Sequence, residues 1–143
     1  MNISQNRPHS IFDEKTIAEI DAKEQGARIK TVEFINDLAG KLGFEPVNNF
    51  DELELTPEQI KKIFYVKPSL DKLSGIKNLY YKKNLENGEM VKFCARPSGL
   101  GETIASDIFS PKFESDGHAT NHDFNYHEFE GLLRQSIGLN RPV

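Results

Sequence analysis

The feature of this sequence that most constrains its fold is an Asn-Gly pair, Asn87–Gly88, which stands between two runs of β-forming residues. The residues that make up these runs are Leu79, Tyr80, Tyr81 and Leu85 before the pair, and Met90, Val91, Phe93 and Cys94 after it. Because Asn and Gly both tolerate a positive φ, the pattern predicts a β-hairpin over about 78–95 that is closed by a type I′ turn. A single hairpin is marginal in water, so other elements must cover it.

Helical patterns precede the hairpin. Apolar residues recur at helical spacing over 17–42, Gly26 divides or kinks this pattern, and Gly43 is placed to end it in a left-handed conformation. A second helix begins in "TPEQIKKIFY", where Thr56 is the N-cap and Gln59 completes a capping box.

One more helix follows the hairpin. Its apolar stripe runs over 129–137, and Gly138 is a natural stop. The segment "ETIASDIF" before it fits either a short helix or a strand, and "NNFDELE" is expected to be a loop. The order of elements predicts an α+β fold, in which N-terminal helices, a central hairpin and a C-terminal helix form one compact domain.

The length of 143 residues is that of one ordinary domain, so we expect 1–143 to be a single domain with flexible ends at 1–9 and 140–143. The N-terminus lacks the apolar core of a signal peptide, and no apolar run approaches the roughly 20 residues that span a bilayer. Cys94 is the one cysteine. These features predict a cytoplasmic protein without a membrane partner.

Charge is distributed unevenly along the chain. The 18 basic and 22 acidic residues give a net charge of −4, yet residues 61–96 have 9 basic and 3 acidic side chains. Residues 1–60 have a net charge of −6, and residues 97–143 have one of −4. Five aromatic residues are interleaved with the basic block: Phe64, Tyr65, Tyr80, Tyr81 and Phe93.

The basic block has two interpretations. It is either a surface that attracts an anionic partner, or a region that neutralises acidic segments of the same chain. Alternate residues of a strand share a face, which predicts Tyr80 and Lys82 on one face of the hairpin and Tyr81 and Lys83 on the other. At most half of these residues can therefore belong to one surface.

From the first interpretation we expect a small binding module, such as an inhibitor, adaptor or regulator, whose partner is another protein with an acidic surface. The candidate partner-binding residues are the cations and tyrosines of the hairpin and of the helix before it: Lys61, Lys62, Tyr80, Tyr81, Lys82, Lys83 and Arg96. A nucleic-acid accessory role for the same block is an alternative, although proteins of that class are more often basic overall. Neither hypothesis requires a cofactor.

A His/Asp/Glu-rich segment, 116–130, suggests a metal-dependent or acid–base enzyme as a further alternative. If a helix begins near His122, then Asp123, His127 and Glu130 share one of its faces and are the candidate catalytic residues. The same side chains, with His118 and His122, are the candidate ligands of a transition metal. Spacings of four and three are also typical of a solvated helix face with paired charges.

Two other features favour ordinary structural roles. The glycines of "RPSGLGETIASD" would suit a phosphate-binding loop only if a helix followed them, and the segment lacks the lysine of a P-loop, so we expect a simple connection. Cys94 has no surrounding motif of a cysteine hydrolase, which favours a buried structural thiol.

Overall fold

The computed structural model describes residues 14–63, 78–114 and 116–139. Its elements in chain order are α1 (Glu14–Lys41), β1 (Glu45–Val47), the 3₁₀ helix η2 (Phe50–Leu53), α2 (Pro57–Lys62), β2 (Leu79–Asn84), β3 (Met90–Ser98), β4 (Thr103–Phe109), β5 (His118–Phe124) and α4 (Tyr126–Ser136). The predicted α+β class is confirmed. The expected flexible ends, and the continuation of the second helix beyond 63, lie outside the described residues.

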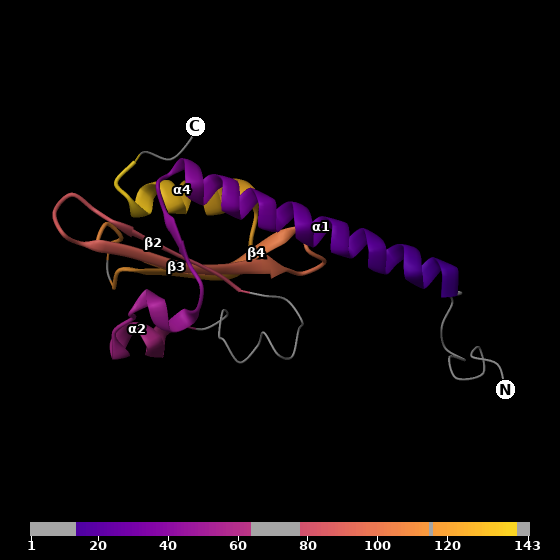
Figure 1. The fold of residues 1–143 in the computed structure, drawn as a ribbon, viewed down its shortest axis with the longest axis horizontal. Coiled ribbons are helices and arrows are strands. Elements are labelled where there is room, and N and C mark those ends of the chain that lie inside the picture. The colour runs from indigo at the N-terminus through magenta and orange to yellow at the C-terminus, as the bar shows by residue number, and fades with distance from the viewer. Residues whose placement is uncertain (1–13, 64–77, 115, 140–143) are drawn as a thin grey trace.

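The five strands form one antiparallel sheet in the order β1-β2-β3-β4-β5, so each strand pairs with its neighbours in the chain. Figure 1 shows α1 and α4 on one face of this sheet and α2 on the other. The molecule therefore has three layers, with the sheet in the middle. Alternate residues of each strand point into two different environments.

The larger core lies between the sheet and the helices α1 and α4. Phe93 is at its centre, fully buried, and its ring contacts those of Phe44, Tyr81 and Phe129 at centroid distances of 5.0, 5.1 and 5.8 Å. The aliphatic members of this core come from both layers: Ile35, Leu38, Val91, Ile104, Ile108 and Leu133. Burial of large aromatic and aliphatic side chains is the main stabilising contribution to such a fold.

The predicted hairpin is confirmed as β2 and β3, which pair antiparallel with Tyr80 opposite Cys94 and Tyr81 opposite Phe93. The predicted type I′ turn is wrong. Within the turn only Gly88 has a positive φ, of 86°. The N–H of Gly88 donates to the carbonyl of Leu85 at 3.1 Å. This geometry is a three-residue loop with glycine in the left-handed position, the next most common hairpin connection.

The first helix is one continuous element of 28 residues that passes through Gly26, so the glycine does not divide it. Its predicted end is confirmed. Gly43 has a φ of 82°, and the N–H of Phe44 donates back to the carbonyl of Ala39 at 2.9 Å. This Schellman motif turns Phe44 into the core beside Phe93.

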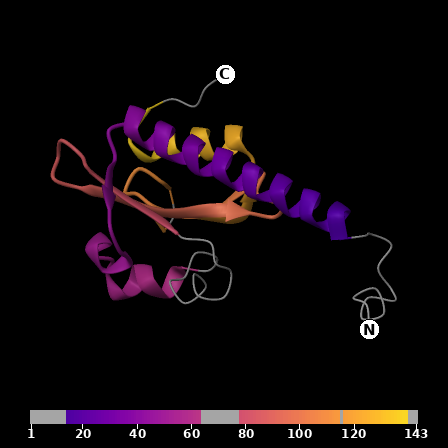
Figure 2. The same cartoon turned by 45° about the vertical axis from the view of Figure 1, so that its right-hand side comes forward.

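Figure 2 shows that the N-terminal part of α1 extends past the sheet. The β3–β4 turn reaches the helix at Glu24 and Arg28, where Gly101 lies against the helix backbone. From Glu14 to Lys23, every side chain that the structure describes is at least partly exposed. We call Glu14–Lys23 the α1 overhang.

Two strands, β1 and β5, were not predicted from the sequence. β1 lies just before the segment 48–54 that was expected to be a loop, η2 lies within that segment, and the segment that fitted either a helix or a strand is the strand β4. The helix expected to begin near His122 begins at Tyr126, with Asn125 as its N-cap, because residues 118–124 pair with β4 as β5. The strand assignment of Asp123 overturns its predicted place on a helix face.

Candidate functional site

The two hairpin tyrosines are buried in different layers, each with 7% of its surface exposed. Tyr81 lies under α1, stacked on Phe93, and its hydroxyl donates to the side-chain carbonyl of Asn36. Burial raises the pKa of Tyr81 above its usual value. Tyr80 lies on the opposite face, next to Phe50. Neither ring is placed at the surface, so neither can be the exposed anchor that the sequence suggested.

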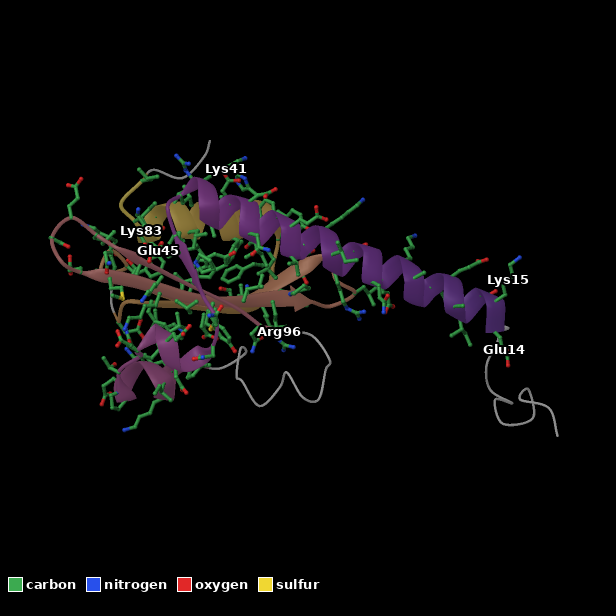
Figure 3. All side chains as sticks on the ribbon, in the orientation of Figure 1. Glu14, Lys15, Lys41, Glu45, Lys83 and Arg96 are labelled. Carbon is green, nitrogen blue, oxygen red and sulfur yellow. The ribbon has the colours of Figure 1, made fainter. Side chains whose placement is uncertain are left out.

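The basic residues are also divided between the two faces. Figure 3 shows Lys83 on the α1 side of the sheet and Arg96 on the α2 side. The amine of Lys83 lies against Gly43, near the negative C-terminal end of the α1 dipole. Lys82 pairs directly across the hairpin with Lys92, on the α2 side. The predicted alternation of faces is therefore confirmed.

Several cations on the α2 side contact acidic or carbonyl groups of this chain. Lys92 donates to the backbone carbonyl of Glu54 at 2.6 Å. Lys62 donates to the carbonyl of Asp116 at 3.1 Å and lies 3.8 Å from its carboxylate. The burial of Lys92 lowers its pKa, an effect that the charge of Glu54 opposes and that of Lys82 reinforces. These contacts favour internal neutralisation for Lys62 and Lys92, whereas Lys61 remains exposed.

The histidine-rich segment is split between a strand and a helix. His118, His122 and Asp123 are in β5, whereas His127 and Glu130 are in α4. His122, Asp123 and His127 are exposed. Among the residues that the structure describes, no three His, Cys, Asp or Glu side chains lie together as a metal-binding group.

The structure adds one residue that the sequence analysis did not single out, Asp107. Its carboxylate lies 2.8 Å from the Nε2 of His118, and the two side chains are 0% and 7% exposed. The imidazole also stacks on Phe109 at a centroid distance of 4.5 Å. The pair ties β4 to β5 on the α2 side of the sheet. No sequence signal could reveal it, because the segment that contains Asp107 was ambiguous between helix and strand.

Cys94 is beside this pair on β3. Its thiol donates to the backbone carbonyl of Asp107 at 3.9 Å, and only 1% of the residue is exposed. Burial raises the pKa of the thiol far above its usual range, and the negative charge of Asp107 raises it further. A protonated, buried thiol is a poor nucleophile, in agreement with the predicted structural role.

The glycine-bearing segment connects two strands, β3 and β4, rather than a strand and a helix. Gly101 has a φ of 95°, and its carbonyl accepts a hydrogen bond from the hydroxyl of Thr31 at 2.5 Å. A Cβ at this position would lie 2.8 Å from the backbone nitrogen of Arg28. The glycine is therefore needed for close approach to α1, as expected for a simple connection.

An open groove lies beside this contact, where the α1 overhang leaves the sheet. It has a volume of about 490 Å³, and its lining consists of Lys23, Gly26, Ala27, Lys30, Glu102 and Tyr126. Two exposed lysines of α1 stand over a mainly apolar surface. In this groove a concave shape, apolar groups and two lysines that make no salt bridge within the described part of the chain occur together.

Comparison of the chain with protein-family models, with curated proteins and with solved structures found no match. Of the helices described, none combines the length and the apolar character required to cross a membrane.

Proposed function

We propose that this chain is a small binding module that engages an acidic surface of a partner protein. The observation that carries the proposal is the α1 overhang. A helix normally buries its apolar stripe, but Ile20 in the overhang is 39% exposed, and Ile29, farther along α1, is 60% exposed. Exposed apolar side chains on a projecting helix are suited to a protein partner. The exposed amines of Lys23 and Lys30 on α1 are suited to acidic groups of that partner.

The hairpin is the second possible contact surface of this module. Lys61 on α2 is exposed and Lys82 on β2 is partly exposed, so both can still attract an acidic partner. Buried Tyr80 and Tyr81 cannot supply the apolar part of the contact from this surface. We therefore assign the main contact to the overhang, and a steering role at most to the hairpin cations.

The experiment that tests the proposal is affinity capture from native cell lysate with four proteins. They are the wild type, an overhang variant Ile20→Glu, a hairpin variant Lys61→Glu/Lys82→Glu, and a control Leu139→Glu. Leu139 is matched to Ile20 because it is 43% exposed, and it follows α4 rather than lying on α1, α2 or β2. We expect a partner that the wild type and the control retain and that the overhang variant loses.

Each capture is repeated after nuclease treatment, which separates a protein partner from a nucleic acid. A partner lost only with the hairpin variant would move the surface to β2 and α2. Capture of the same material by all four proteins would contradict the proposal.

A further inference from the structure

We propose that the groove between α1 and the start of α4 binds an amphipathic helix of the partner, through an apolar side chain flanked by two acidic residues. The inference rests on the proposed binding function and specifies the chemistry of the partner. Three observations carry it: a fixed apolar floor, two lysines at a defined spacing, and a glycine that the fold does not need.

The floor of the groove is held rigidly in place. Tyr126 stacks on Phe34 at a centroid distance of 4.2 Å and an interplanar angle of 14°. Its hydroxyl is 2.6 Å from the hydroxyl of Thr31, which in turn donates to Gly101. A ring fixed from two sides loses little conformational freedom when a ligand covers it, which favours binding.

The charged rim is made by Lys23 and Lys30. They are seven residues apart on α1, which corresponds to about 10 Å along the helix axis. Both are exposed, and neither makes a salt bridge within the described part of the chain. Acidic residues seven apart on a partner helix match this spacing. Glu102, also in the lining, disfavours acidic groups on that part of the partner.

Gly26 lies between the two lysines in the sequence and lines the same groove. Glycine inside a helix is less favourable than almost any other residue. Here a Cβ would meet no atom within 4 Å, so no contact inside the described structure requires the glycine. Its missing side chain keeps the groove open and lets a second helix approach α1 closely.

The proposal is tested with a synthetic, fluorescently labelled peptide of about 16 residues, long enough to form a helix. It presents leucine between two glutamates seven residues apart, and a second peptide has lysines in their place. Binding to the full chain is measured by fluorescence anisotropy. We expect the wild type to bind the glutamate peptide at least tenfold more tightly than the lysine peptide, and Lys23→Glu/Lys30→Glu to reverse this preference.

Gly26→Leu provides the second arm, because it fills the groove while improving the helix propensity of α1. We expect at least tenfold weaker peptide binding and a melting temperature that is unchanged or higher. Gly40→Leu is the matched control, since Gly40 is also exposed on α1 and a Cβ there also meets nothing within 4 Å. This control should bind the peptide as the wild type does.

Equal binding of both peptides by the wild type, a dissociation constant for the glutamate peptide above about 1 mM, or full binding by Gly26→Leu would each overturn the groove proposal. If the groove proposal is overturned in this way while capture from lysate still depends on Ile20, the binding module stands and its contact lies on the overhang, outside the groove. Loss of both results removes both proposals.

Discussion

The two faces of the sheet differ sharply, although the same strands make them. Under α1 and α4 the sheet presents Phe93, Val91 and Ile108 to an apolar core built around aromatic rings. Under α2 it presents polar and ionisable groups, among them Asp107 and Cys94, which are buried and hydrogen-bonded. One face stabilises the fold mainly by apolar burial, and the other combines a smaller apolar cluster around Leu53, Tyr80 and Ala105 with paired polar groups.

This difference follows from what covers each face. α1 and α4 contribute helical stripes long enough to bury whole rows of side chains. The elements described on the other face, η2 and α2, are 4 and 6 residues long. Charged groups there must find partners within the chain, because burying an unpaired charge is costly. Lys62 and Lys92 of the basic block contact other groups of this chain, whereas the described side chains of the α1 overhang are at least partly exposed.

The largest expected effect is a difference in stability between substitutions at two neighbouring residues of β3 that point to opposite faces of the sheet. Phe93→Ala should lower the free energy of unfolding by about 3–5 kcal/mol, because it leaves a cavity among three aromatic rings. Cys94→Ala, on the other face, removes one buried sulfur atom and should cost about 1 kcal/mol. Urea denaturation measures both. Equal costs would show that the two faces contribute alike.

A second prediction concerns the contact between the β3–β4 turn and α1. Gly101→Ala should cost about 2–3 kcal/mol, because a left-handed residue is strained and the new Cβ would overlap the backbone at Arg28. Gly88→Ala is the control, since it also has a positive φ but no atom within 4 Å of a Cβ, and it should cost about 1 kcal/mol. Similar melting temperatures for the two variants would contradict the required close approach.

The buried pair on the α2 side gives a third prediction. His118→Ala should cost about 2 kcal/mol, since it leaves the carboxylate of Asp107 without its imidazole partner. His127→Ala, at an exposed position of α4, should change stability by less than about 0.5 kcal/mol. Thermal denaturation of both variants at neutral pH decides the matter. A His118 variant as stable as the His127 variant would mean that the pair contributes nothing.

The smallest expected effect is the pH dependence that Cys94 introduces. Because burial raises the thiol pKa in the folded protein, both states hold the proton below about pH 9, the usual pKa. Above that pH only the unfolded chain loses it, so stability should fall by up to about 1.4 kcal/mol per pH unit. Urea denaturation between pH 8 and pH 9.8 should show this loss in the wild type and not in Cys94→Ala. Parallel curves would place the ionised thiol in the folded state.

The local features that depend on only a few neighbouring residues were predicted correctly from the sequence. The capping box of Thr56 and Gln59 is present. The glycine stops at Gly43 and Gly138 are present as left-handed residues. Each depends on contacts between residues a few positions apart, which the sequence displays directly. The prediction of a type I′ turn at Asn87 was nevertheless wrong, although it also depends on neighbouring residues. The loop that closes the hairpin is one residue longer than a type I′ turn allows.

The sequence by itself determined the class of the fold, the hairpin, the helix stops at Gly43 and Gly138, and the alternation of hairpin side chains between two faces. Only the tertiary structure decided that residues 118–124 form a strand, that both tyrosines are buried, and that Asp107 meets His118. The physical reason is that strand pairing and burial depend on which distant segments cover which face. The exposure of the α1 overhang has the same cause. The residues of α1 form one helix along its whole length, but the sheet that could cover it ends before the helix does.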